Sequence, residues 1–356
     1  MKIMDLKYKP FSIKFNTPFI NSTGTLNERK GFILSITDEL GNSSLGEIAP
    51  LPGFSSESLD EAREDLSGLL HILSGMETGD DLQCIKDLSE DYILTSSARF
   101  GFEQAMLGLL IKRDRSISEK LFLKTKTQID VNAVVGLGCD GNVISQIENK
   151  MLEGFSTFKI KAGRNNFTDD LNLIKGIRRR FGGAIKIRLD ANGKWDFEKA
   201  RCNIEMLEIF DIEYIEEPCG GIENLIALSE ISSIPVAIDE SLVSMQFAFD
   251  VMEQSSIPFI IIKPMIRGAL IENIELIRQA AILDRNIIIS SSFETALGIS
   301  QLAFLSSLTH HSYAHGLDTI DYFSEYFFAD KNRAKKGIID FSPLSYPKDF
   351  NYDAVC

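Results

Sequence analysis

Two lysines, Lys159 and Lys161, stand one residue apart in the segment Thr157-Phe158-Lys159-Ile160-Lys161. The β-branched and aromatic neighbours favour a strand, and residues two positions apart in a strand point to the same side. Two ammonium groups held close together lower each other's pKa, because like charge disfavours the charged form. A lysine tuned in this way can act as a general base near neutral pH.

Further charged residues follow Lys161 at regular intervals. Asp190, Glu216, Asp239 and Lys263 come after steps of 29, 26, 23 and 24 residues. Each of the five charged residues directly follows an aliphatic one, namely Ile160, Leu189, Ile215, Ile238 and Ile262. Because side chains alternate along a strand, an aliphatic residue that faces outward leaves the charged residue facing inward. We therefore expect five charged side chains to converge from five strand ends.

The three carboxylates in this series, Asp190, Glu216 and Asp239, would repel one another strongly unless a cation neutralised them. A set of oxygen ligands without histidine or cysteine suits a hard ion. The sequence therefore predicts a Mg²⁺ site, in which Mn²⁺ could substitute. Lys161 and Lys263 would flank a ligand that rests on this ion.

Each motif taken alone also has an ordinary structural explanation. The triplet Asp239-Glu240-Ser241 is typical of a helix N-cap, and Glu216-Glu217-Pro218 is typical of a strand that ends at a proline. Their shared parity and spacing favour a functional site. We interpret Trp195 and the cysteines as packing residues, and we interpret the histidines as structural or surface residues: His71, His310, His311 and His315.

Repeated strand–helix units would position the charged series. The predicted strands cover 131–135, 157–161, 185–190, 213–216, 236–239, 259–263 and 287–290. The predicted helices cover 141–152, 169–180, 197–209, 222–231, 245–253, 269–283 and 296–308. Parallel strands need such crossovers, and seven or eight units in about 190 residues favour a closed (β/α) barrel with its site at the strand C-termini.

The residues before this repeat have a different pattern. Segments 11–15 and 31–37 are predicted strands, and a capping box of Ser58 and Glu61 opens a helical region from about 58 to 110. We therefore predict an α+β domain over residues 1–120 and a barrel over 121–320. An irregular tail, 321–356, is expected to fold back on the first domain.

The chain has 356 residues and a formal net charge of −14. An acidic surface disfavours nucleic acids and anionic membranes as partners. No apolar run is long enough to cross a membrane, and the N-terminus lacks the apolar core of a signal peptide. The five cysteines are dispersed, which fits a reducing compartment. We expect a cytoplasmic protein that binds a small carboxylate substrate and could form homo-oligomers.

The strand-end residues resemble the enolase superfamily, and within it the branch of the muconate-lactonising enzymes. This resemblance covers nearly the whole chain, including the segments 46–47 and 50–54. It implies a (β/α)7β TIM-like barrel with an α+β N-terminal capping domain, whose loops, here about 19–24 and 51–54, close over the substrate. Members of this superfamily pair a lysine or histidine base with Mg²⁺. The motifs that carry the resemblance are Lys159-Ile160-Lys161, Asp190-Ala191-Asn192-Gly193-Lys194-Trp195, Ile215-Glu216-Glu217-Pro218, Ile238-Asp239-Glu240-Ser241 and Lys263.

Two further stretches, 290–298 and 316–319, resemble the o-succinylbenzoate synthase family. That resemblance implies Mg²⁺-dependent syn-dehydration of 2-succinyl-6-hydroxy-2,4-cyclohexadiene-1-carboxylate to 2-succinylbenzoate in menaquinone biosynthesis, through a metal-stabilised enediolate. Lys161 would be the base, and Lys159 would make it easier to deprotonate. Lys263, on the opposite side, would stabilise the developing anion as a cation.

The resemblance also implies supporting residues. Ser290, Ser291 and Ser292 would hold a substrate carboxylate with hydroxyl and N–H groups at a strand end that opens a helix. Asn192 and Arg188 are expected to help bind the substrate and, with Glu240, to orient the metal ligands and the lysines.

Other functions remain open on the sequence alone. Two opposed lysines also suit racemisation of an N-acylamino acid or epimerisation of a dipeptide within the same superfamily. Dipeptide epimerases typically have Asp-x-Asp at the last strand, where this chain has Gly316-Leu317-Asp318. A Schiff-base aldolase could use Lys263 as its nucleophile, but it leaves the three carboxylates unexplained. A metal-binding barrel without catalysis leaves the lysine pair without a purpose.

Overall fold

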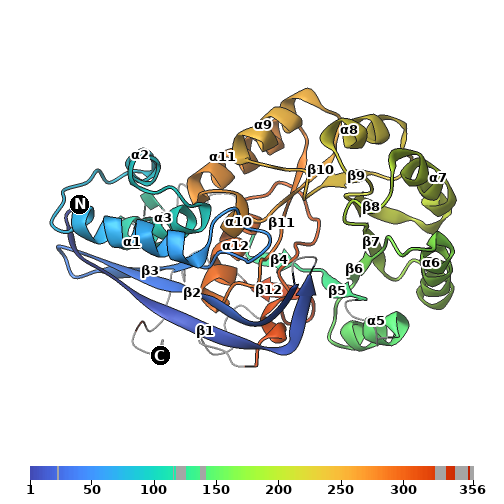
Figure 1. Ribbon diagram of the computed structural model, residues 1–356, viewed down its shortest axis with the longest axis horizontal. Coiled ribbons are helices and arrows are strands. Elements are labelled where there is room, and N and C mark those ends of the chain that lie inside the picture. The colour runs from blue at the N-terminus through green and yellow to red at the C-terminus, as the bar shows by residue number, and fades with distance from the viewer. Residues whose placement is uncertain are drawn as a thin grey trace.

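A curled parallel sheet of seven strands lies beside an α+β capping domain in the computed structural model (Figure 1). The structure describes residues 1–21, 24–114, 116–117, 126–136, 142–324, 334–340 and 352. This α/β architecture, with a capping domain and a barrel-like domain, is the fold class that the sequence predicts.

The capping domain combines an antiparallel sheet with helices. Its sheet has the order β1-β2-β3. The side chain of Ser58 accepts from the Glu61 amide, and the Glu61 carboxylate accepts from the Ser58 amide, so the predicted capping box is confirmed. The elements of this domain are β1 (Ile3–Asn21), β2 (Gly24–Asp38), β3 (Ser43–Ile48), α1 (Leu59–Leu73), α2 (Leu82–Tyr92) and α3 (Ser96–Arg113).

The barrel sheet has the order β5-β6-β7-β8-β9-β10-β11, so each strand pairs with its neighbours in the sequence. Helices follow the strands as crossovers and lie outside the curled sheet (Figure 1). The strands are β5 (Ala133–Val135), β6 (Thr157–Lys161), β7 (Lys186–Asp190), β8 (Ile212–Glu216), β9 (Val236–Ile238), β10 (Phe259–Ile262) and β11 (Asn286–Ile289). The helices are α5 (Val143–Leu152), α6 (Phe167–Phe181), α7 (Phe197–Leu207), α8 (Ile222–Ile231), α9 (Met245–Gln254), α10 (Pro264–Arg267), α11 (Leu270–Ile282) and α12 (Ala296–Ser307).

The first barrel strand differs from its prediction over 131–135. β4 (Gln128–Asp130) pairs with β12 (Ile338–Asp340), and β5 begins only at Ala133. The Val131 amide donates to the carbonyl of Gly337 at 2.8 Å, which draws this part of the chain away from β6. The sequence could not predict this break, because the partner lies about 200 residues away.

Residues 315–316 link the two edges of the sheet. Bridges join Ser290 to Gly316 and Val131 to His315, both in the parallel sense. The His315 ring is buried, and its Nδ1 accepts from the Ile289 amide at 3.0 Å. This contact agrees with our interpretation of His315 as a structural residue.

The described parts of the tail contact both domains. The Ser324 amide donates to the Lys14 carbonyl on β1, and the ring of Tyr352 lies below the ammonium group of Lys9. β12, in contrast, belongs with β4 of the barrel side. The predicted division at residues 120 and 121 lies outside the described residues, so the domain limits of 1–120, 121–320 and 321–356 stay predictions.

The interior of the barrel is layered. Its lower layer contains a cluster of buried apolar residues, Tyr214, Ala237, Phe259, Ile261 and Ile288. Tyr214, Ala237 and Ile261 each lie two residues before a charged strand end and share its inward parity. Phe259 has the same parity as Ile261, and Ile288 has that of Ser290. No helix in the described part of the chain is both long and apolar enough to cross a membrane.

Candidate active site

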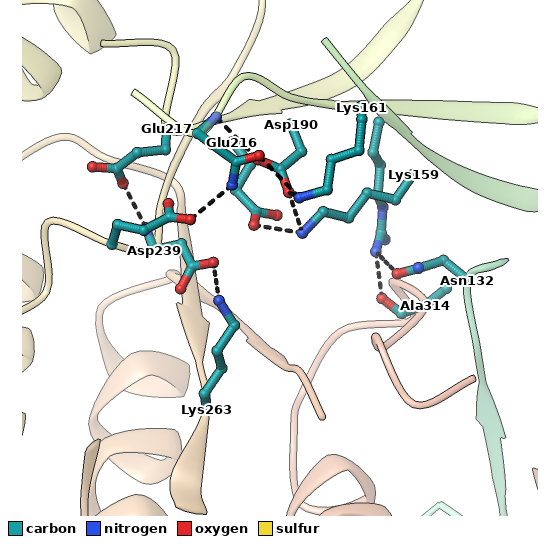
Figure 2. A network of polar contacts seen from close by, with 12 residues as sticks. Asn132, Lys159, Lys161, Asp190, Glu216, Glu217, Asp239, Lys263 and Ala314 are labelled. Carbon is teal, nitrogen blue, oxygen red and sulfur yellow. Dashed lines mark hydrogen bonds and ion pairs between the residues drawn. The ribbon is translucent and has the colours of Figure 1, made fainter. Parts of the chain in front are cut away.

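The charged strand ends meet at one rim of the barrel, as their parity predicts (Figure 2). Parallel pairing places Lys161 beside Asp190 and Asp190 beside Glu216. Asp239 directly follows the C-terminal end of β9, and Lys263 directly follows that of β10. The fold therefore brings together all five residues of the series.

Each lysine in this group is paired with a carboxylate. The Lys159 ammonium lies 2.5 Å from Glu216 Oε1 and 2.9 Å from Asp190 Oδ2. The Lys161 ammonium lies 2.7 Å from the same Asp190 oxygen. Lys263 pairs with Asp239, which follows the neighbouring strand (Figure 2). The opposite charges offset the cost of burying this many ionised groups.

Burial and charge act against each other on these groups. Burial alone would raise the pKa of Asp190, but Lys159 and Lys161 outweigh it and hold that pKa below its ordinary value. Burial, together with the negative charges of Asp190 and Asp239, raises the pKa of Glu216 well above its ordinary value, although Lys159 opposes this shift. Burial lowers the pKa of Lys159, but the surrounding carboxylates outweigh it and raise that pKa well above its ordinary value.

These carboxylates fit a divalent cation by their chemistry. Three side chains with oxygen ligands come from adjacent strands and line the same cavity. Burial, and after it the negative charges of Asp190 and Asp239, raises the pKa of Glu216, and a bound cation would oppose both effects. Within the described ranges, no three His, Cys, Asp or Glu side chains are already arranged as a ligand set. The ammonium groups of Lys159, Lys161 and Lys263 are ion-paired with the same three carboxylates, Asp190, Glu216 and Asp239.

Asn192 and Glu240 lie where the sequence predicts. Asn192 Oδ1 accepts from the Lys161 ammonium at 3.0 Å, and its Nδ2 donates to Glu240 Oε1 at 2.8 Å. Burial, with the nearby charge of Asp239, raises the pKa of Glu240. A chain of hydrogen bonds therefore runs from Glu240 through Asn192 to the predicted base.

Glu217 belongs to the strand-end motif 215–218, but its type and spacing did not predict a role in the site. Its carboxylate accepts from the Asp239 amide at 2.8 Å and from the Ser241 amide at 3.0 Å, and also from the Ser241 hydroxyl. Its backbone has a φ of 43°, in the left-handed region. Burial raises its pKa to about 7. Glu217 thereby fixes the loop that carries Asp239, and its place between Glu216 and Pro218 was the available signal.

A cavity of about 600 Å³ opens above the charged rim. Three of its lining residues, Phe19, Leu51 and Phe54, come from the capping domain, within the two loops expected to close over the substrate. The side chains of residues 20–23 lie outside the described residues. The barrel residues that line this cavity include Lys159, Lys161, Asp190, Asn192, Lys194, Glu216, Asp239, Glu240, Lys263, Ser290, Ser291, Ser292, Phe293, Gly316, Thr319 and Tyr322.

The three predicted serines line the same cavity as the carboxylates that are predicted to bind the metal. Ser291 shares hydrogen bonds with Glu294 and Thr319. Ser292 is buried, and its hydroxyl finds no hydrogen-bond partner among the described residues. A buried hydroxyl without a partner is costly unless a ligand satisfies it.

Arg188 differs from its prediction as a substrate-binding residue. Its inward parity is as expected, but it is fully buried and is not one of the cavity-lining residues. Its guanidinium donates to Glu213 at 2.6 Å, to Asn132 Oδ1 at 3.0 Å and to the Ala314 carbonyl at 2.6 Å. It lies one step before Asp190 on β7, in the barrel floor. Arg188 thus ties barrel strands together below the cavity.

Comparison with known proteins assigns both parts of the chain to families. Residues 142–343 match the family described as "Enolase C-terminal domain-like", and residues 4–108 match the family described as "MenC, N-terminal domain". The o-succinylbenzoate synthase of Aliivibrio salmonicida is 32% identical over 303 residues, which cover 84% of this chain and 85% of that protein. The L-Ala-D/L-Glu epimerase of Bacillus subtilis is 25% identical over 315 residues, which cover 86% and 85%.

A similar fold occurs in the dipeptide epimerase of Enterococcus faecalis, solved in complex with Mg and the dipeptide L-Leu-L-Tyr. The TM-score is 0.84 at 22% identity, and the match covers 96% of this chain and 98% of that one.

The resemblance seen in the strand-end motifs is confirmed by the family matches, which span both domains. This protein is an enzyme of the enolase superfamily with an N-terminal domain of the MenC type.

Proposed function

We propose that this enzyme acts as an o-succinylbenzoate synthase, a carbon–oxygen lyase. It would convert 2-succinyl-6-hydroxy-2,4-cyclohexadiene-1-carboxylate to 2-succinylbenzoate and water. The MenC-type N-terminal domain and the relative of 32% identity both favour this activity.

The observation that carries the proposal is the placement of two lysines around one set of carboxylates. Lys161 belongs to β6 and Lys263 follows β10, and three strands separate β6 from β10 in the sheet order. Both side chains line the cavity. A substrate held between them has an amine on each side of its reacting carbon.

Lys161 would move the proton. In its neutral form its Nζ takes the α-proton of the substrate, and the electron pair of the broken C–H bond moves into the ring. The carbon–hydroxyl bond then breaks, and Lys161 returns the proton to the leaving hydroxide, so that water departs and the ring becomes aromatic. Lys159, held charged by its carboxylate partners, shares Asp190 Oδ2 with Lys161 and keeps a positive charge beside it.

Asp190, Glu216 and Asp239 would hold Mg²⁺, with Mn²⁺ as a substitute. When bound, this ion would supply positive charge for the substrate carboxylate and for the negative charge that develops as the proton leaves. Lys263 adds a fixed positive charge on the opposite side, and Asn192 keeps Lys161 oriented. The Mg-bound epimerase of the same fold supports the choice of ion.

The end of the barrel favours a dicarboxylate over a dipeptide. Gly316 lines the cavity without a side chain. The carboxylate of Asp318 lies 2.9 Å from the Lys150 ammonium, and Asp318 is not one of the cavity-lining residues. The backbone N–H groups of Ser290, Ser291 and Ser292 already donate within the protein, so this wall offers hydroxyl groups to a substrate. Among the described residues beside the serines, no free carboxylate lines the cavity to receive an ammonium group.

A second candidate is an N-acylamino acid racemase or a dipeptide epimerase. The same opposed lysines favour it, since each could exchange a proton on one face of the α-carbon, and the Bacillus subtilis relative is an epimerase. The two candidates differ in the fate of the substrate.

Product analysis decides between these candidates. The enzyme with Mg²⁺ is incubated in D₂O, separately with the cyclohexadiene and with N-succinylamino acids and L-Ala-L-Glu, and the products are followed by NMR. The proposal predicts rapid formation of 2-succinylbenzoate. Proton exchange at the α-carbon of the amino acid substrates, without dehydration of the cyclohexadiene, would replace it with the second candidate.

A further inference from the structure

Arg29 lies in β2, is 1% exposed, and bridges the capping domain and the barrel. Its Nη1 donates to the Pro50 carbonyl at 2.6 Å, and its Nη2 donates to the Ala49 carbonyl. Its Nε donates to the Phe293 carbonyl at 3.2 Å. One buried guanidinium thus holds backbone carbonyls of two segments that are about 240 residues apart.

The carbonyls that Arg29 holds adjoin or belong to two segments that form walls of the cavity. The first, which we call the lid segment, is 51–54, and its Leu51 and Phe54 line the cavity. The Phe54 amide donates to the Leu51 carbonyl at 3.0 Å, so this segment is a tight turn that follows the carbonyls held by Arg29. The second, the wall segment, is 290–293, and all four of its residues line the cavity.

Phe293 is held in an unfavourable backbone conformation. Its φ is 63°, in the left-handed region that residues with a side chain rarely adopt. Such a conformation persists only where the surroundings enforce it. The hydrogen bond from Arg29 to the Phe293 carbonyl is one such restraint. The Phe293 ring also packs against the Phe19 ring, with 4.7 Å between centroids.

Two buried carboxylates hold the chain on either side of Phe293. Glu47 of β3 accepts from the Thr295 amide at 2.9 Å and from the Gly298 amide at 2.8 Å, so it caps the start of α12. A Cβ at residue 298 would lie 2.9 Å from the Glu47 carboxylate, and glycine permits this approach. Glu294 accepts from the Ser292 amide at 2.7 Å. The buried guanidinium of Arg29 interacts electrostatically with both carboxylates.

We propose that Arg29 is a positioning residue that sets the distance between the lid segment and the wall segment, and thereby determines how tightly the substrate is held. Three carbonyl acceptors in different directions require the planar fork of a guanidinium, which a lysine ammonium cannot reproduce. Arg29 does not touch the substrate, and it acts through Phe54 and Phe293. The identity of the substrate rests on the proposed function.

The test compares the wild-type enzyme with Arg29→Lys, which keeps the charge and loses the fork. Arg63→Lys, on the exposed face of α1, is the matched control. We expect the KM of Arg29→Lys for the cyclohexadiene to rise by about tenfold or more, the size of one lost charge-assisted hydrogen bond. We expect kcat to change by less than about threefold, because the base and the metal ligands are untouched.

Hydrogen exchange supplies a readout that does not depend on turnover. Amides of residues 51–55 and 290–295 should exchange faster in Arg29→Lys, and those of α8 should not. Unchanged exchange in either segment, or an unchanged KM together with unchanged kcat, would overturn the role of Arg29. If the wild-type enzyme does not convert the cyclohexadiene, the proposed function fails and exchange alone decides on Arg29. If Arg29→Lys does not fold, hydrogen exchange of the wild type supplies the test. The proposal then predicts that the amides of Ser55 and Thr295 have equal free energies of opening, and unequal values would reject it.

Discussion

The Lys159 ammonium on β6 reaches past β7 to the Glu216 carboxylate on β8, with 2.5 Å between Nζ and Oε1. A second oxygen of the site, Asp190 Oδ2, lies 2.9 Å from the same ammonium. Lys159 therefore bridges two of the three predicted metal ligands. We infer that the lysines hold the carboxylates close together, where their mutual repulsion would otherwise separate them.

Replacing one predicted metal ligand should weaken Mg²⁺ binding. For Glu216→Gln we expect the Kd for Mg²⁺, measured by titration calorimetry, to rise by at least about tenfold, because a neutral amide is a poorer ligand for a hard cation. Glu205→Gln on the exposed face of α7 is the control and should bind Mg²⁺ as the wild type does. An unchanged Kd in Glu216→Gln would remove Glu216 from the ligand set.

Glu217 should affect the metal without touching it. Glu217→Ala frees the Asp239 amide and both Ser241 donors, so the loop that carries Asp239 loses its anchor. We expect Mg²⁺ affinity to fall by about tenfold, in the range known for residues that orient metal ligands. Glu223→Ala, at the exposed start of α8, serves as the comparison. Equal Mg²⁺ affinity in both variants would leave Glu217 with a purely structural role.

The sequence predicted the barrel well because its signals are local and periodic. The alternation of Ile187, Arg188, Leu189 and Asp190 gives the inward face of β7 without knowledge of any distant residue. The repeat of about 25 residues gives the parallel order of strands. Together they placed five charged side chains on one rim, and the structure brings these five together.

What the sequence could not predict depends on contacts between distant segments. Arg188 has the right parity, but its burial is decided by Glu213 and by the carbonyl of Ala314, far along the chain. The bond from Arg29 to Phe293 crosses from one domain to the other. Periodicity carries no information on such partners, so it cannot predict buried ion pairs or contacts between the domains.

Arg188 should contribute to stability. Arg188→Met leaves the Glu213 carboxylate without its buried partner, and we expect the free energy of unfolding to fall by about 3–5 kcal/mol. Lys186→Met removes an exposed partner of the same carboxylate, 3.4 Å away, and should cost less than about 1 kcal/mol. Urea denaturation measures both. A loss below about 1 kcal/mol for Arg188→Met, with a raised KM, would restore its role in substrate binding.

Stability should fall as the pH rises through the weakly acidic range. Burial raises the pKa of Glu103 to about 7 although Ser89 and the Ile271 amide donate to it, so the folded protein binds a proton that the unfolded chain has lost above about pH 4.5. A buried carboxyl group with a raised pKa stabilises the folded state fully below about pH 4.5, and this contribution to the free energy of unfolding is lost as the pH rises to about 7.

Denaturation at pH 5 and pH 8 checks this effect. Relative to Glu103→Gln, which cannot ionise, the wild type should lose about 2–3 kcal/mol between the two pH values. Glu64→Gln, on the exposed face of α1, should follow the wild type. A difference between wild type and Glu103→Gln that stays constant with pH would contradict a raised pKa.

The most direct test of the account is the ultraviolet-monitored conversion of the cyclohexadiene to 2-succinylbenzoate. It is run with Mg²⁺ and with EDTA, on the wild type, on Lys161→Ala and on Lys199→Ala, an exposed lysine of α7. The account predicts rapid turnover by the wild type and by Lys199→Ala, which EDTA abolishes, and no turnover by Lys161→Ala. Turnover that survives EDTA, or that survives the loss of Lys161, would contradict it.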